Sequence, residues 1–198
     1  PTENQFASVR ISSRRAMLVE GVSGGTAVPV FQDSPTKAAY SASITALVPA
    51  ASATDIFEIA GSASKTIRVT RLQISGTATA AGAYDFILLK RATANSAGTS
   101  SSPTQVVHDS NDAAVTAIVK AYTANPTTGT LVGNLRSVKA TVTTTAGAIT
   151  NVPTVFDFGQ GSAKGIVLRG TAQSLCVNLN STTITGGSLN IYVEWTEE

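Results

Sequence analysis

The chain of 198 residues has little cysteine and little charge. Its single cysteine, Cys176, allows no disulfide within the chain and excludes a metal centre built on several thiolates. Charged residues make up 13% of the chain, and 14 basic against 12 acidic residues give a net charge of +2. This composition excludes a coiled coil, and it lacks the clustered basic excess of a nucleic-acid-binding protein. We therefore expect no nucleic-acid partner and a protein that matures in a reducing compartment.

Long hydrophobic runs and secretion signals are also missing. The most apolar run, residues 86–89 (FILL), is stopped by Lys90 and Arg91, far short of the ~18 residues that span a bilayer. Residues 1–5 (PTENQ) carry neither the basic nor the apolar region of a secretory signal. These observations predict a protein made in the cytoplasm, without a membrane partner.

The sequence does contain a strong alternation of apolar and polar residues. Apolar residues make up 42% of the chain, which is enough to bury a core, and Ala, Gly, Ser and Thr together make up nearly half of it. Thr- and Val-rich runs of period two, broken by turns, indicate an all-β sandwich or barrel. We expect a sandwich over residues 41–198, with helix limited to a turn or two near Asp112. The expected strands cover residues 55–60, 65–75, 84–91, 117–123, 131–143, 153–158 and 164–169, with two more at the C-terminus.

The two C-terminal strands give a sharper prediction. Residues 175–179 and 189–195 both alternate, and Gly186 and Gly187 between them allow the positive φ of a tight turn. This pattern predicts a C-terminal β-hairpin. Trp195 lies on the apolar face of the second strand and should be buried.

One internal strand changes phase. Within residues 65–75 the apolar positions up to Val69 have one parity, and those from Leu72 onwards have the other. A β-bulge near Thr70 would absorb this slip, or the strand is buried on both faces.

Residues 1–40 differ from the rest of the chain. Their apolar residues are scattered among Gly24, Gly25 and Pro29, with no sustained period. The segment is either an N-terminal arm or a set of extra edge strands, and we favour an arm that reaches a neighbouring subunit because closed homo-oligomers are common. The candidate interface residues are Val9, Arg10, Ile11, Arg14, Arg15, Leu18 and Phe31. The acids expected to pair with these arginines are Glu194, Glu197 and Glu198.

No constellation of reactive residues stands out. The only histidine, His108, precedes Asp109, but neighbours on a strand point to opposite faces, so we expect a surface histidine at a strand end. Residues 109–112 (DSND) lack the glycine and the distal acid of a calcium loop and fit Asx turns. Asp55 and Glu58 flank two apolar residues. A sequence does not show whether two acids lie close together in space, so these two give no sign of acid–base catalysis. We predict no catalytic, cofactor-binding or metal-binding residues, and no enzyme activity.

Seven stretches of the chain carry a resemblance. They are residues 53–59 (ATDIFEI), 65–71 (KTIRVTR), 86–91 (FILLKR), 108–112 (HDSND), 121–127 (AYTANPT), 167–171 (VLRGT) and 193–198 (VEWTEE). Through them the block 54–198, about three quarters of the chain, resembles structural proteins encoded near the head and tail genes of tailed bacteriophages.

The resemblance implies a role and partners. It implies a virion component assembled in the host cytoplasm, in particular a capsid decoration (cement) protein with a β-sandwich or jelly-roll body. Its partners would be the phage major capsid protein or other virion proteins and further copies of itself in a homo-oligomer, of which a trimer is one form. No cofactor is implied.

Two other function classes remain open at this point. The first is a receptor- or carbohydrate-binding module of a phage tail or fibre, which should expose two or three coplanar aromatic residues near a cluster of loops. The second is an enzyme, which needs a converging catalytic set. The Ser- and Gly-rich loop 94–102 contains no aromatic residue, which favours the structural role.

Overall fold

The computed structural model describes residues 37–144, 153–159 and 164–198. In this part of the chain the secondary structure is all β, and the segment near Asp112 forms a turn. The seven candidate interface residues between Val9 and Phe31 lie outside the described residues. The strands are β1 (Ala38–Leu47), β2 (Ala53–Ala60), β3 (Ile67–Ala78), β4 (Gly82–Arg91), β5 (Ser100–Ser101), β6 (Gln105–Val107), β7 (Ile118–Tyr122), β8 (Leu131–Thr144), β9 (Thr154–Asp157), β10 (Ile166–Leu168), β11 (Ser174–Thr182) and β12 (Ser188–Glu197).

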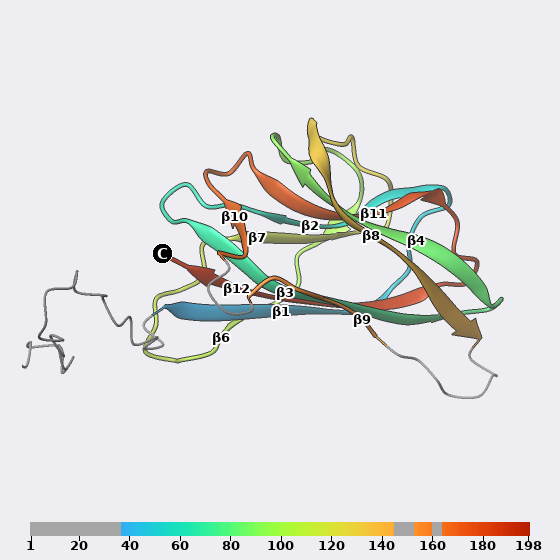
Figure 1. Cartoon of the computed structure of the whole chain (residues 1–198), viewed down its shortest axis with the longest axis horizontal. Helices are drawn as coiled ribbons and strands as arrows, with labels where there is room; N and C mark the ends of the chain where they lie inside the picture. Colours follow the sequence, from blue (N-terminus) through green and yellow to red (C-terminus); the bar gives the residue numbers. More distant parts are fainter. Residues whose placement is uncertain (1–36, 145–152, 160–163) are drawn as a thin grey trace, which may run out of the picture. The chain divides into compact units, whose positions relative to one another are not determined.

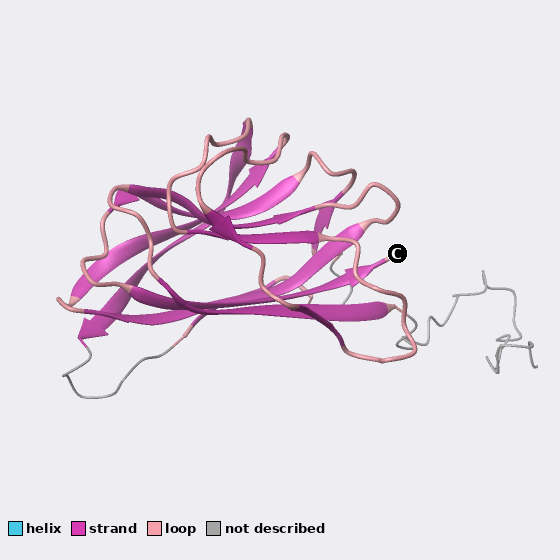
Figure 2. Cartoon of the chain, turned by 180° about the vertical axis from the view of Figure 1, so that it is seen from behind, coloured by secondary structure: helices cyan, strands magenta, loops and turns pink. Residues whose placement is uncertain are grey.

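The strands form two antiparallel sheets packed face to face, which confirms the predicted β-sandwich (Figures 1 and 2). The lower sheet in Figure 1 has the order β6-β1-β12-β3, and β9 and β10 pair with the other side of β3. The upper sheet has the order β5-β7-β2-β11-β4-β8. The last residues of β8 pair in parallel with Thr77 and Ala78 of β3 and so join the two sheets along one side.

Each strand expected between residues 55 and 169 is present, as β2, β3, β4, β7, β8, β9 and β10. β1, β5 and β6 are additional. β1 begins at Ala38 and places Tyr40, Ala42 and Ile44 in the core. Because it is rich in alanine and serine, which have no strong strand preference, its sequence gives little signal.

The predicted C-terminal hairpin is wrong. β11 pairs with β2 and β4 in the upper sheet, whereas β12 pairs with β1 and β3 in the lower sheet. The turn at Gly186, whose φ is +58°, therefore carries the chain from one layer to the other. Alternation shows that a strand has one buried face, but both sheets of a sandwich bury their inner faces in the same core. The pattern therefore cannot assign a strand to a sheet.

Of the two alternatives for residues 65–75, a β-bulge near Thr70 or burial on both faces, the structure has the bulge. The register of β3 with β12 shifts by one residue at Thr70, whose carbonyl accepts the N–H of Phe158 (2.8 Å). An extra residue changes the face on which later side chains lie. Val69 and Leu72, three residues apart, consequently both point into the core.

Trp195 anchors one end of the core. Its indole is fully buried, as predicted, and stacks on Tyr40 with ring centroids 6.0 Å apart and an interplanar angle of 18°. The indole N–H donates to Glu197 Oε1 (3.1 Å). The Glu197 carboxylate also accepts the backbone N–H groups of Thr116 and Ala117. This corner ties β12 to the connection between β6 and β7.

The expectation that Glu197 pairs with the N-terminal arginines is therefore wrong. Glu197 is 4% exposed, and its carboxylate already binds these donors and lies 3.5 Å from Lys65 Nζ. The neighbouring Glu198 forms ion pairs with Lys37 and Arg68. The charges at this end of β12 are thus used within the β-domain.

Replacing Trp195 with alanine should lower the free energy of unfolding by about 3–5 kcal/mol, because it removes a fully buried indole and its stack on Tyr40. Urea unfolding followed by circular dichroism measures the loss. Tyr192→Ala is the matched control, since Tyr192 is half-buried and lies on the opposite face of β12. Equal losses of unfolding free energy in the two variants would contradict the assignment of Trp195 to the core face of β12 and of Tyr192 to the outer face.

Candidate functional site

Asp55 and Glu58 of β2 both lie on the outer face of the upper sheet. Residues three apart on a regular strand point to opposite faces. β2, however, has an extra residue at Ile56, where its register with β11 shifts. Ile56 and Phe57 both enter the core, and the two acids share the outer face, each only 1% exposed.

Neighbouring strands add three polar side chains to this face. On β4, Leu88 points into the core, so Arg91 three residues later points outward. On β11, Val177 lies in the core, and Cys176 and Asn178 on either side of it face outward. The outer face of β2, β4 and β11 thus carries a cluster of buried polar groups rather than a solvated surface.

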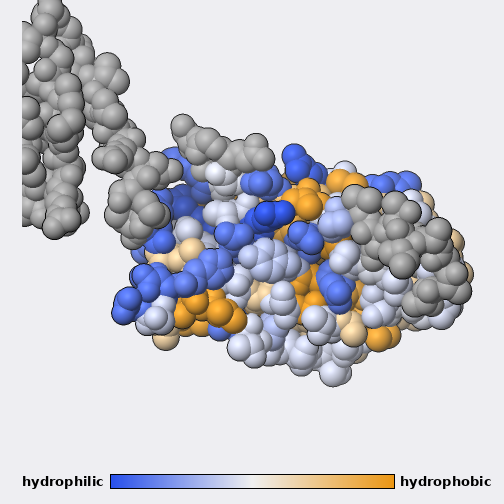
Figure 3. Space-filling model, turned by 90° about the horizontal axis from the view of Figure 1, so that it is seen from below, coloured by the Kyte–Doolittle hydropathy of each residue, from blue (hydrophilic) through white to orange (hydrophobic). Residues whose placement is uncertain are grey.

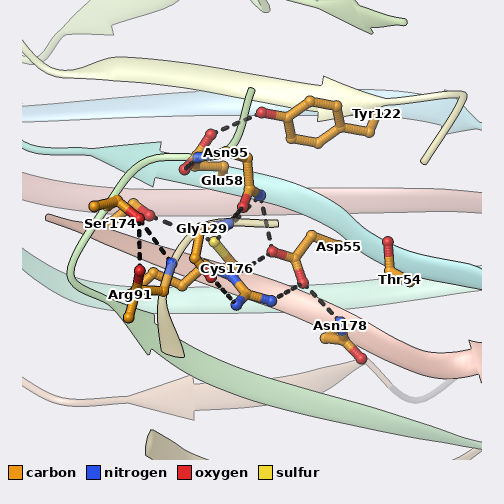
Figure 4. Close-up of polar contacts among 12 residues, drawn as sticks. Thr54, Asp55, Glu58, Arg91, Asn95, Tyr122, Gly129, Ser174, Cys176 and Asn178 are labelled. Atoms are coloured by element: carbon orange, nitrogen blue, oxygen red, sulfur yellow. Dashed lines mark hydrogen bonds and ion pairs between the residues drawn. The ribbon is translucent and has the colours of Figure 1, made fainter. Parts of the chain in front are cut away.

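A two-pronged ion pair joins β4 to β2 (Figure 4). Arg91 Nε donates to Asp55 Oδ2 (2.6 Å), and Arg91 Nη2 donates to Asp55 Oδ1 (2.8 Å). The side-chain amides of Asn178 (2.7 Å) and Asn95 (2.8 Å) donate to the same carboxylate. Burial by itself would raise the pKa of Asp55, but the hydrogen bonds from Arg91 and the two asparagines outweigh it and hold the pKa below its ordinary value.

Asn95, in the loop after β4, fastens two loops to the sheet. Its backbone N–H donates to Glu58 Oε1 (2.8 Å), and its side-chain oxygen accepts the N–H of Gly129 (2.9 Å). The Gly129 carbonyl in turn accepts a hydrogen bond from Arg91 Nη1 (2.7 Å). Gly129 belongs to the connection between β7 and β8. The loops that follow β4 and β7 are therefore bound to each other and to β2.

Tyr122 and Cys176 complete the network. The Tyr122 hydroxyl donates to Glu58 Oε2 (2.7 Å), and burial together with this carboxylate raises the pKa of Tyr122. The Cys176 sulfur lies 3.7 Å from the Asn95 amide nitrogen and 3.6 Å from the Ser174 hydroxyl. Burial and the nearby carboxylates raise the pKa of Cys176, so its thiol stays protonated and unreactive.

These contacts make a structural network in which no side chain is held as a nucleophile. Arg91 and Asp55 satisfy each other, and the Cys176 thiol is protonated. Among the described residues, no group of three or more His, Cys, Asp and Glu side chains is placed to hold a metal ion. No helix in the same residues is long and apolar enough to cross a membrane. The chemistry of the site is to hold loops in place.

Of the residues considered from the sequence, Asp55, Glu58 and Cys176 lie in this network, whereas His108 and Asp109 lie elsewhere. His108 is exposed at the end of β6, as expected, and the N–H of Asn111 donates to the Asp109 side chain (2.9 Å) in the expected Asx turn. Asn95 was missed, because it belongs to the Ser- and Gly-rich loop 94–102, which is otherwise mostly exposed. No local pattern distinguishes this asparagine from its neighbours.

Comparison of the chain with protein-family models, with curated proteins and with solved structures finds no match. The geometry of the described residues therefore carries the functional argument.

Replacing Asp55 with asparagine should destabilise the fold by roughly 3–5 kcal/mol, because it leaves the Arg91 guanidinium buried without its counter-charge. Urea unfolding measures this loss. Asp85→Asn is the control: Asp85 pairs with Lys139 in an exposed ion pair, whose removal should cost about 1 kcal/mol or less. Similar losses in both variants would contradict a structural role for the buried pair.

Stability should fall as the pH drops below about 5. The folded-state pKa values of both Asp55 and Glu197 lie below their ordinary values, so the unfolded chain takes up protons first as the pH falls. The stability that these acids contribute is present above their unfolded pKa values and is lost towards their folded ones. Urea midpoints at pH 7, 5, 4 and 3 should decline in that order, and Glu197→Gln should flatten the decline. A constant midpoint from pH 7 to pH 3 would refute this.

Proposed function

We propose that the protein is a structural component of a tailed-phage particle, a capsid decoration (cement) protein that stabilises the shell through contacts between subunits. Its partners are the major capsid protein or other virion proteins and further copies of itself. The observation that carries the proposal is a long strand edge that no described strand pairs with over most of its length and that bears exposed aliphatic side chains.

That edge belongs to β8, at the side of the upper sheet (Figure 1). One side of β8 pairs with β4 over most of its length. Its first half exposes three large aliphatic residues, Leu131 (53%), Val132 (62%) and Leu135 (42%). Exposed aliphatic side chains beside unpaired backbone groups are typical of a place where another chain adds to a sheet.

The remaining surface supports close packing of many copies. Figure 3 shows the underside of the lower sheet, where hydrophilic and intermediate residues cover most of the visible face and hydrophobic ones form small patches. A row across this sheet consists of Ser41, Glu194, Arg71 and Asp157, in which both signs of charge are mixed. A low net charge allows copies to pack without mutual repulsion, and short Ser and Thr side chains lose little entropy on docking.

The N-terminal segment supplies the second half of the proposal; it ends before residue 38, where β1 begins, and not at residue 40. Val9, Ile11, Leu18 and Phe31 of this segment would bury apolar surface against a neighbouring subunit or the shell, a contribution of roughly 1.5–3 kcal/mol each. Arg10, Arg14 and Arg15 would pair with acids of that partner.

A carbohydrate-binding module is the alternative. Such a module stacks sugars on exposed aromatic rings. In the described part of the chain every aromatic residue is buried or half-buried; the half-buried ones are Tyr84, Phe158 and Tyr192. The described loops thus offer no stacking platform, and the assembly role fits the surface better.

Removing the three arginines of the N-terminal segment tests the proposal. Full-length Arg10→Ser/Arg14→Ser/Arg15→Ser should bind particles that lack the protein about tenfold or more weakly than the unaltered chain in a co-sedimentation assay. The control Lys120→Ser/Lys164→Ser/Arg169→Ser makes the same change in net charge within the β-domain and should bind normally. Electron cryo-microscopy of the native particle should show the β-sandwich on the shell. Equal binding by both triple variants, or binding to a glycan array instead of to particles, would contradict the proposal.

A further inference from the structure

The outer face of the lower sheet is a broad and regular surface (Figure 3). On the inner face one residue from each of four strands lies buried in the core: Ala42 of β1, Val193 of β12, Leu72 of β3 and Phe156 of β9. Because successive side chains of a strand alternate between the two faces, the residues on either side of these four project outward. They form straight rows across the sheet.

Three such rows can be read from the register. The first is the mixed row of Ser41, Glu194, Arg71 and Asp157. The second, two residues along each strand, is Ser43, Tyr192, Gln73 and Val155. The third lies beyond the bulge at Thr70 and ends on β10: Ala39, Thr196, Arg68 and Val167.

The first row presents two charges of opposite sign to the outside. Arg71 is exposed, and it forms no ion pair among the described residues although acids flank it on both neighbouring strands. Glu194 likewise forms no ion pair there and accepts a hydrogen bond from the Tyr192 hydroxyl (3.3 Å). Side chains stand roughly perpendicular to a sheet, so this arginine and this glutamate point side by side away from the domain. A surface that offers an acid and a base in the reverse order would pair with both.

We propose that two copies of the chain pack face to face through the outer faces of their lower sheets, related by a two-fold axis that runs parallel to the strands midway between β12 and β3. The inference rests on the proposed role in assembly and names the contact by which copies associate. A two-fold interface uses the same patch on both subunits, so the patch must be complementary to itself. The rotation places β12 of one copy over β3 of the other, and β1 over β9 and β10.

Charge complementarity selects this axis. The rotation reverses each row, so Glu194 of each copy meets Arg71 of the other and two ion pairs form across the interface. Ser41 meets Asp157 of the other copy, which pairs a hydroxyl with an acid. An axis along β12 itself would instead place Glu194 over Glu194, and like charges brought together oppose association.

The other rows are compatible with the same axis. In the second row Tyr192 meets Gln73 of the other copy, and Ser43 meets Val155. In the third row Ala39 meets Val167, which joins two apolar side chains, and Thr196 meets Arg68. No row brings like charges together. An axis moved by one strand towards either side would leave an outer strand of the sheet uncovered, so the central axis also buries the most surface.

The size of the face predicts how strong the contact is. Strands lie about 4.8 Å apart and rise about 3.4 Å per residue, so four strands and residues 190–196 of β12 define a face of about 20 Å by about 20 Å. Its flat area of about 400 Å² is below the accessible surface of about 800 Å² that each partner of a standard interface buries. We therefore expect a weak dimer that depends on concentration, as suits copies held close together on a particle.

Charge reversal tests the contact in the full chain by sedimentation velocity up to millimolar concentration. Arg71→Glu places glutamates opposite each other, and Glu194→Arg places arginines opposite each other, so each variant alone should self-associate about tenfold more weakly or worse. An equimolar mixture of the two variants should associate like the unaltered chain, because both contacts then join a glutamate to an arginine. Arg136→Glu makes the same charge change at an exposed position of β8 and is the control, which should leave association unchanged.

Each outcome decides the inference, once circular dichroism and urea midpoints have verified that the variants fold. Association of the single variants at the strength of the unaltered chain would overturn it, and so would a mixture that associates no better than the single variants. Loss of association in Arg136→Glu alone would place the contact at the edge of β8 instead. If the unaltered chain binds particles but does not self-associate, the face-to-face contact is wrong while the assembly role stands. If it does neither, the proposed function and the inference both fail.

Discussion

The ion pair between Asp55 and Arg91 is the interaction on which the outer layer of the upper sheet depends. Both side chains are almost completely buried, and a charge left there without its partner would cost several kcal/mol. β2 and β4 must therefore keep their places on either side of β11, the strand that separates them. Only in that arrangement does Asn95 find its partners, and only then do Asn95 and Gly129 bind each other and fix two loops over Cys176.

The carboxylate of Glu197 likewise holds distant segments together at the lower sheet. Glu197 accepts hydrogen bonds from the Trp195 indole and from backbone N–H groups of the connection that leads from β6 to β7. That connection carries the chain from one sheet to the other, so its position fixes how the two layers meet. Among the described residues of this weakly charged chain, three acids are used inside the protein, where each holds segments distant in sequence: Asp55, Glu58 and Glu197.

The interior of the sandwich and the edges of its sheets differ in how far their polar groups are paired. Among the described residues, the buried side-chain polar atoms have hydrogen-bond partners apart from Arg68 Nε, and the short edge strands β5 and β6 offer little room for pairing. Among the described strands, β8 is the exception, because its long edge carries exposed aliphatic residues. Strand addition at such an edge is one way in which chains associate, since backbone groups of an open edge give affinity and the adjacent side chains give selectivity. The proposed role in a particle therefore rests on the longest edge that the described residues leave unpaired.

The sequence alone determined the β-sandwich and the burial of Trp195, and it gave the bulge at Thr70 as one of two alternatives. All three depend on whether a side chain faces the core, and the period of apolar residues along a strand records that property directly. The same period does not record strand partners, so the assignment of β11 and β12 to one hairpin was wrong. The sequence also did not predict that Asp55 and Glu58 lie on the same face of the sheet, or that Asn95 is buried in a loop rich in serine and glycine. Both were decided only by the tertiary structure, because each polar group is buried by partners tens of residues away in the chain and no local pattern encodes such a contact.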